Sequence, residues 1–198
     1  MDITVLIPTR GERINGIVSC INSIGMTDVK TKILKNTGGW LPEVNKILKD
    51  ITGYMIMGAD DMDFHPNAIK YAVNILKSNY PDGDGVVGFN QVTLSNFCKA
   101  GFVVMGRKFI DWFPDSRVYC PDYKHYFADT ELFEYASLIK KFTYCPEAKV
   151  NHYHFSITGN MDSTAMISKR SYAFDSETYA KRQEKKFLWG RDFNRVND

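Results

Sequence analysis

The chain has 198 residues, 44% of them hydrophobic and 14% aromatic, which is enough for one domain with a substantial core and too little for two. Its formal net charge is +2, and residues 166–198 carry eight Lys/Arg against five Asp/Glu, so the body is near neutral and the tail is basic. A basic tail fits an anionic partner and a solvated helix face about equally well.

The composition argues against a membrane protein and against a disulfide-bonded one. No stretch approaches the about 18 consecutive apolar residues that span a bilayer, and the N-terminus lacks the pattern of a signal peptide. The four cysteines, at positions 20, 98, 120 and 145, form no Cys-x-x-Cys pair, which favours buried, reduced thiols over a zinc site. We therefore expect a cytoplasmic protein without a transmembrane segment, in the host cytoplasm if the chain is viral.

The first half of the chain alternates predicted strands and helices. The apolar run Ile3–Ile7, closed by Pro8, is typical of a strand buried on both faces. Apolar residues at helical spacing then predict a helix ending near Gly25, whose buried face would contain Ile14, Ile17, Val18, Ile21 and Ile24. Further strands are expected at 32–35, 54–57 and 86–89, and further helices at 41–51 and after Pro66.

The second half is less regular but contains both element types. We expect a strand at 102–105, a helical turn at 108–113, an aromatic-rich loop at 115–127, a helix at 129–140 and short strands at 142–145 and 149–155. The polar segment 156–168 predicts a loop, either a lid that orders over a substrate or a passive linker. The alternation predicts an α/β protein with a doubly wound sheet, in which ligands bind beyond the carboxyl ends of the strands.

Three acids, Asp60, Asp61 and Asp63, follow the predicted strand at 54–57 and have four competing interpretations. A calcium loop fails because Pro66 and Ala72 stand where glycine and glutamate are required. Helix capping accounts for one acid but not for three. A dinucleotide-binding turn would need G-x-G-x-x-G after the first strand, where the sequence has PTRGER. A divalent metal shared with a substrate diphosphate accounts best for clustered carboxylates, which are costly to bury without a cation.

Four segments, IPTRGER, YMIMGADDMDFHPNAI, FADTEL and NHYH, follow one another in this order between residues 3 and 155, and the helix that contains Asn45 precedes the second. Together they resemble the GT-A glycosyltransferases, most of all those of family 2. The resemblance implies a Rossmann-like sheet of the GT-A type, mixed but mostly parallel and flanked by helices. It places a catalytic domain at residues 1–155, followed at 156–198 by a flexible lid loop and a basic, aromatic C-terminal helical extension.

The resemblance also implies which residues bind a nucleotide-sugar donor and the Mn²⁺ or Mg²⁺ that bridges its phosphates. The metal ligands would be Asp61, Asp63, His152 and His154. Asp129 in FADTEL matches the catalytic base of inverting members, and Glu131 is the fallback base. Asp129 also suits the N-cap of the helix expected at 129–140, and Glu131 suits its first turn. The donor would be bound by Pro8, Thr9, Arg10, Arg13, Asn36, Gly38, Gly39, Trp40, Asn45 and Asp60, with Lys169 and Arg170 reaching its phosphates from the lid.

Two departures from the family pattern limit what the resemblance implies. Gly58 replaces the usual first acid of the metal motif, which leaves open which two of Asp60, Asp61 and Asp63 would bind the ion. The glycine-rich acceptor segment is also missing, so the acceptor hydroxyl is left open between a modified DNA base, another nucleic acid, a glycan and a small molecule. The hypothesis is a metal-dependent, inverting glycosyltransferase; the alternatives are a sugar-phosphate nucleotidyltransferase and a non-catalytic module that binds sugar or nucleic acid.

Overall fold

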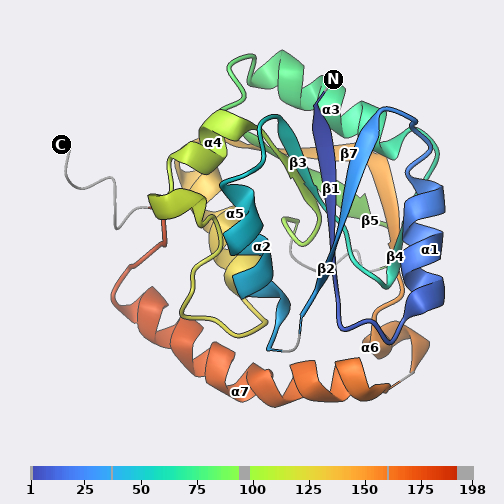
Figure 1. The fold of residues 1–198 in the computed structure, drawn as a ribbon. Helices are drawn as coiled ribbons and strands as arrows, with labels where there is room; N and C mark the ends of the chain where they lie inside the picture. The colour runs from blue at the N-terminus through green and yellow to red at the C-terminus, as the bar shows by residue number, and fades with distance from the viewer. Residues whose placement is uncertain (1, 37, 94–98, 160, 191–198) are drawn as a thin grey trace.

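A computed structural model describes residues 2–36, 38–93, 99–159 and 161–190 and shows one sheet with helices on both faces (Figure 1). The strands are β1 (Ile3–Thr9), β2 (Val29–Lys35), β3 (Tyr54–Met57), β4 (Met62–Phe64), β5 (Val86–Gln91), β6 (Val103–Met105) and β7 (Phe142–His152). The helices are α1 (Ile14–Ser23), α2 (Trp40–Leu48), α3 (Ala68–Asn79), α4 (Arg107–Asp111), the 3₁₀ turn η1 (Pro114–Ser116), α5 (Ala128–Leu138), α6 (Phe155–Thr158) and α7 (Ser163–Glu184).

The seven strands form a mixed sheet in the order β2-β1-β3-β6-β5-β7-β4. β1 pairs in parallel with β2 and β3, and β5 pairs in parallel with β7, whereas β6 and β4 run antiparallel to their neighbours. Five strands therefore point the same way, and the prediction of a mixed, mostly parallel α/β sheet is confirmed. The continuous apolar run of β1 is buried along its whole length, as expected for a strand covered on both faces.

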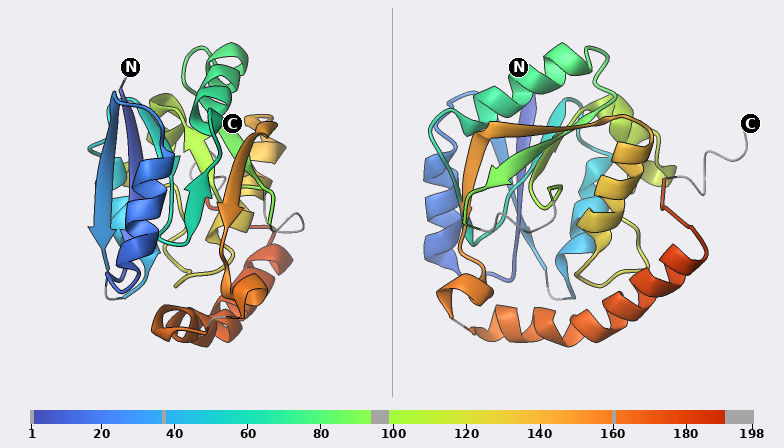
Figure 2. Two further views of the ribbon diagram at one scale, coloured as in Figure 1. Left: turned by 90° about the vertical axis from the view of Figure 1, so that its right-hand side faces the viewer. Right: turned by 180° about the vertical axis from the view of Figure 1, so that it is seen from behind.

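Each face of the sheet packs against its own set of helices, which gives two hydrophobic cores (Figure 2). One core joins the sheet to α2, α4 and α5 through residues such as Val44, Phe109 and Leu132. The other joins it to α1 and α3 through residues such as Cys20 and Val73. In α2 and α3, buried apolar residues recur at the 3.6-residue spacing of a helix, and Ile47 of α2 is half-buried.

The predicted face of α1 is partly wrong. Ile17 and Ile24 are buried as predicted, but Ile14 and Val18 are 66% and 50% exposed, and Cys20 is buried although it was not predicted. The helix is rotated because Gly16 lies against the turn between β3 and β4: a Cβ at Gly16 would lie 2.0 Å from the carbonyl oxygen of Asp60. Close approach to this turn, rather than apolar spacing, sets the orientation of α1.

Residues 142–168 also differ from the expectation. The two short strands expected at 142–145 and 149–155 are one strand, β7, which ends at His152, and its pairing with β5 is interrupted between Phe89 and Asn90. The loop expected at 156–168 is largely helical: α6 begins at Phe155, and residues 163–168 are the first turns of α7. Asp162 caps α7 by accepting a hydrogen bond from the amide of Ala165, at 2.8 Å.

α7 runs along the edge of the sheet where the parallel strands end (Figures 1 and 2). Among the described residues, none of the helices is both long and apolar enough to cross a membrane. Cys20, Cys120 and Cys145 are buried free thiols, as expected, and Cys98 lies outside the described residues.

Candidate active site

A cavity of about 310 Å³ opens at this edge, between the ends of the parallel strands and α7. Because β4 is antiparallel, its first residue lies at the same edge as the last residue of β7: Met62 pairs with His152. The turn from β3 to β4, which carries Asp60 and Asp61, is therefore directed into the cavity. Other walls come from the end of β1, the segment before α2, residues 124–126, the start of α5 and the first turns of α7.

Most of the residues predicted for the site line this cavity. They are Pro8, Thr9, Arg10, Arg13, Asn36, Gly38, Gly39, Trp40, Asp60, Asp61, Asp129, His152 and His154. The five that do not line it are Asn45, Asp63, Glu131, Lys169 and Arg170.

Asp60 and Asp61 share one cationic partner, Arg13. The Nη1 of Arg13 lies 3.3 Å from Oδ1 of Asp60 and 2.8 Å from Oδ2 of Asp61. Asp60 is 6% exposed and also accepts a 2.6 Å hydrogen bond from the hydroxyl of Thr9. Burial raises the pKa of Asp60, while its bonds to Thr9 and Arg13 oppose that rise.

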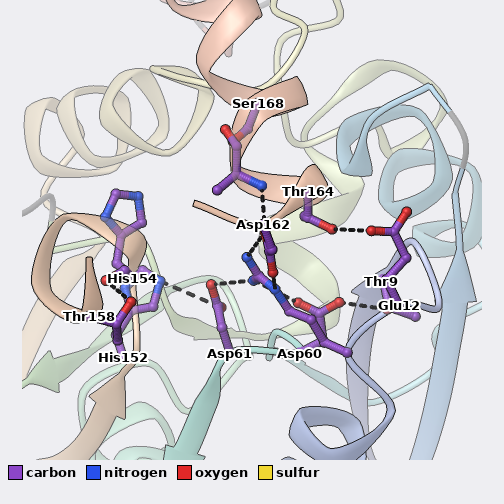
Figure 3. A network of polar contacts seen from close by, with 12 residues as sticks. Thr9, Glu12, Asp60, Asp61, His152, His154, Thr158, Asp162, Thr164 and Ser168 are labelled. Atoms are coloured by element: carbon purple, nitrogen blue, oxygen red, sulfur yellow. Dashed lines mark hydrogen bonds and ion pairs between the residues drawn. The ribbon is translucent and has the colours of Figure 1, made fainter. Parts of the chain in front are cut away.

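The guanidinium of Arg13 also connects the acidic turn to α7. Its Nε and Nη2 donate to the two carboxylate oxygens of Asp162, which is labelled in Figure 3, at 2.7 and 3.0 Å. The hydrogen bonds from Arg13 hold the pKa of Asp162 below its usual value. One guanidinium thus faces three carboxylates, which leaves a local charge of about −2 when all three are ionised.

His152 faces Asp61 from the end of β7. Its Nε2 lies 3.6 Å from Oδ1 of Asp61, and its Nδ1 lies 2.9 Å from Oε1 of Gln91. Burial lowers the pKa of His152, which favours the neutral imidazole. With Nδ1 donating to the amide oxygen of Gln91, the lone pair of Nε2 is directed at a carboxylate oxygen of Asp61.

His154 was expected in the same strand as His152, at 149–155, but it lies beyond the end of β7. It caps α6, where its Nδ1 accepts a hydrogen bond from the amide of Ser156 at 3.3 Å. The rings of His152 and His154 are nevertheless 5.4 Å apart, and both line the cavity.

Asp129 lies in the first turn of α5 rather than at its N-cap, which is Phe127. Its Oδ1 accepts a hydrogen bond from the amide of Thr130 at 2.9 Å, and burial raises its pKa. A carboxylate whose pKa lies above that of an ordinary aspartate is a stronger base once it is ionised.

The segment before α2, together with Trp40 at the start of α2, forms another wall of the cavity. The side-chain amide of Asn36 donates to the carbonyl of Thr9 at 3.1 Å, which joins the ends of β2 and β1. Trp40 donates from Nε1 to the carbonyl of His125, also at 3.1 Å, and its ring meets Tyr119 edge-on. Gly39 has a φ of +121°, and a Cβ there would lie 2.8 Å from the carbonyl oxygen of Lys124. Glycine at this position therefore lets the two walls approach each other.

The predicted residues outside the cavity have other partners. Asn45 is buried and pairs through its side chain with both backbone groups of Tyr119, at 2.7 and 3.0 Å. Glu131 is 1% exposed and pairs with Arg182 at 2.6 Å. Asp63 accepts from the hydroxyl of Tyr153 at 2.9 Å and faces a neighbouring cavity of about 330 Å³. Lys169 and Arg170 are exposed on α7.

Among the residues that the sequence analysis missed, Gln91, His125 and Ser168 line the cavity, and Asp162 bonds to Arg13 beside it. Asp162 could have been found as the N-cap of a helix, because aspartate before a run of helix-forming residues is a start signal. Gln91 and His125 carry no local signal. Among the described residues, no group of three or more His, Cys, Asp or Glu side chains is placed to hold a metal ion.

Neither a protein-family profile nor a curated protein sequence matches the chain. Solved protein structures, in contrast, do match the chain. A197 from STIV superposes with a TM-score of 0.53 at 15% identity, over 77% of this chain and 86% of that one. Residues 1–349 of TarS from S. aureus, a GT-A glycosyltransferase, superpose with a TM-score of 0.55 at 13% identity, over 80% of this chain and 62% of that one. The chain has the GT-A fold.

One of the GT-A structures similar to this chain contains a sugar nucleotide. It is the complex of TarS with UDP-GlcNAc, which matches with a TM-score of 0.53 at 16% identity, over 73% of this chain and 56% of that one. The expected fold is thereby confirmed. At these identities the match establishes the GT-A fold alone, and the activity has to be argued from the cavity.

Proposed function

We propose that the chain is a metal-dependent glycosyltransferase that moves a sugar, with inversion, from a nucleotide diphosphate to an acceptor hydroxyl. The observation that carries the proposal is the meeting of Asp61, His152 and Asp129 in one cavity at the carboxyl edge of a GT-A sheet. These residues come from three separate segments of the chain, and a fold alone would not require them to meet.

The donor would lie in the cavity that the segment before α2 and residues 124–126 line together. Trp40 and His125 offer ring surfaces beside the nucleotide, and Thr9 and Arg10 lie where β1 ends. The diphosphate would approach the acidic turn, where a local charge of about −2 repels it. This repulsion is the physical reason to expect a divalent cation.

Asp61 and His152 fit such a cation. Their facing oxygen and nitrogen are 3.6 Å apart, and Gln91 orients the imidazole from behind. A bound Mg²⁺ or Mn²⁺ would neutralise charge on the leaving diphosphate, with phosphate oxygens completing its ligands. Asp60, already bonded to Thr9 and Arg13, would keep the turn in place.

Asp129 is the proposed base. It would take the proton from the acceptor hydroxyl, and the first turns of α7 would keep bulk water from the donor. The acceptor remains open among the classes named above, including nucleic acid.

The proposal is tested by measuring the thermal stability of the protein, and the release of nucleoside diphosphate, with a panel of nucleotide sugars. Each sugar is tested with Mn²⁺, with Mg²⁺ and with EDTA. A donor at about 100 times its Kd adds about 2.7 kcal/mol, which should raise the Tm of a domain of this size by about 5–11 °C. Release of nucleoside diphosphate would show turnover. Pyrophosphate formed from a sugar phosphate and a nucleoside triphosphate would instead indicate a nucleotidyltransferase, and a thermal shift without any release would indicate a binding module. If no nucleotide sugar stabilises the protein with metal present, the proposal is wrong.

A further inference from the structure

Asp175 is a fully buried carboxylate in the middle of α7, directed at the loop that precedes α5. Its oxygens accept hydrogen bonds from three consecutive backbone amides, those of Lys124, His125 and Tyr126, at 2.7, 2.8 and 2.8 Å. An isolated buried carboxylate is costly, and three donors to one charge compensate that cost. This arrangement fixes the loop to α7 through its backbone.

The opposite side of the same loop touches the segment before α2. The carbonyl of His125 accepts from Trp40, and the carbonyl of Lys124 approaches Gly39 so closely that a side chain there would collide with it. Residues 124–126 are therefore held between Asp175 on one side and residues 39–40 on the other.

The loop forms one wall of the cavity. Lys124, His125 and Tyr126 all line it, and the chain then passes through Phe127, with a φ of +66°, into the turn that carries Asp129. A shift of this loop would break its contacts with Gly39 and Trp40, change the shape of the cavity and move the start of α5.

We propose that Asp175 is a positioning residue for the donor pocket: it holds residues 124–126 in contact with Gly39 and Trp40 and so fixes the shape of the pocket wall that they form together. The proposal rests on the proposed function in that it assigns this pocket to the nucleotide sugar. It makes α7 part of the binding site through a side chain that lies one turn beyond Ser171, the last residue of the helix that lines the cavity.

α7 has other attachments that do not involve the loop. The hydroxyl of Tyr179 donates to Glu134 at 2.5 Å, and Arg182 pairs with the buried Glu131 at 2.6 Å. These contacts hold the helix against α5 without Asp175. The variant Tyr179→Phe loosens that attachment and leaves the loop bonds intact, so it is a matched structural control.

The test compares wild type, Asp175→Asn, Asp175→Glu and Tyr179→Phe. The asparagine keeps the size of the side chain but offers one acceptor oxygen, so at least one loop amide loses its partner. Hydrogen exchange of residues 124–126 should accelerate in Asp175→Asn, and the Kd of the nucleotide sugar that stabilises the wild type should weaken about tenfold. Asp175→Glu keeps the charge one methylene farther out, so we expect smaller changes in both measurements. It also provides the comparison if the asparagine variant does not fold.

Three outcomes are decisive. Faster exchange with weaker donor binding in Asp175→Asn, and neither change in Tyr179→Phe, supports the proposal. Unchanged exchange, or unchanged donor affinity despite faster exchange, overturns it. If the wild type binds no nucleotide sugar, the proposed function fails on that result. The role of Asp175 in positioning the loop is then decided by the exchange data alone.

Discussion

Asp129 is the residue whose substitution should separate chemistry from binding. Asp129→Asn keeps the shape of the side chain but removes the proton acceptor, so kcat should fall by about 10²–10⁴-fold while the donor Kd changes little. Because burial raises the pKa of Asp129, the acidic limb of the wild-type kcat/KM profile should lie above the usual aspartate value and disappear in the variant. Steady-state kinetics and calorimetry would check both. Turnover at the wild-type rate would eliminate Asp129 as the base.

Arg13 should compete with a divalent cation for Asp61. Its guanidinium already neutralises part of the charge of Asp60, Asp61 and Asp162, so Arg13→Gln leaves these acids for a metal to compensate. We expect Mn²⁺ to bind about fivefold more tightly, since a partly exposed ion pair contributes about 1 kcal/mol, and the metal-free protein to lose stability.

Electron paramagnetic resonance titration of free Mn²⁺ measures that affinity without any donor or turnover. Arg117→Gln, which removes a guanidinium from the pair with Asp115 far from the cavity, is the control. Equal or weaker Mn²⁺ binding in Arg13→Gln would mean that the two cations do not share Asp61.

At the scale of single elements, helix α1 should respond in an unusual way to the substitution of Gly16 by alanine. Replacing glycine by alanine inside a helix normally stabilises it by about 1 kcal/mol, but at Gly16 the new Cβ would lie 2.0 Å from the carbonyl oxygen of Asp60. Gly16→Ala should therefore destabilise the protein by about 1–3 kcal/mol and displace the acidic turn. Urea unfolding and Mn²⁺ titration would detect the two effects. Asn22→Ala, an exposed site on the same helix, should be neutral or stabilising; a stabilised Gly16→Ala protein would contradict this packing.

How far the elements could be predicted from the sequence depended on the range of the interactions that form them. β1 and the buried faces of α2 and α3 follow from local apolar spacing, and the location of Asp60, Asp61 and His152 follows from the rule that strand ends meet at one edge. The rotation of α1 does not, because the contact between Gly16 and Asp60 is tertiary.

The same reasoning explains the errors around residues 142–168. Nothing local to β7 shows that Pro146 would be accommodated where the pairing with β5 is interrupted. The first turns of α7 have an irregular apolar pattern because one side of the helix roofs the cavity through Thr164 and Ser168 instead of packing in a core. Small polar residues in these positions give a sequence pattern that is typical of a loop.

For the whole molecule, α7 joins parts that lie far apart in the sequence. Asp162 bonds to Arg13, 149 positions away, and Asp175 bonds to residues 49–51 positions away. Arg182 adds a buried pair with Glu131. The expected division into a catalytic domain at 1–155 and an extension at 156–198 stays a prediction. Residues from both sides of position 155 line the cavity.

The stability of the whole protein should depend on pH through His125. Burial lowers its pKa to about 4, with the nearby charges of Asp175 and Asp61 opposing and His154 reinforcing the shift. An unfolded histidine titrates near 6.5, so between pH 6.5 and about 4 the unfolded chain binds the extra proton. The free energy of unfolding should then be fully retained above pH 6.5 and fall by up to about 3 kcal/mol as the pH drops through this window.

His125→Gln removes this titration and leaves the other groups in place. Asp60 and Asp129, whose pKa values are raised by burial, bind protons preferentially in the folded state and act in the opposite direction, but they do so in both proteins. The variant should therefore show a flatter dependence of the free energy of unfolding on pH between 6.5 and 4 than the wild type, measured by urea titration at fixed ionic strength. Parallel curves would show that the proton uptake of unfolding occurs elsewhere, and His154, with its lowered pKa, would be the next residue to substitute.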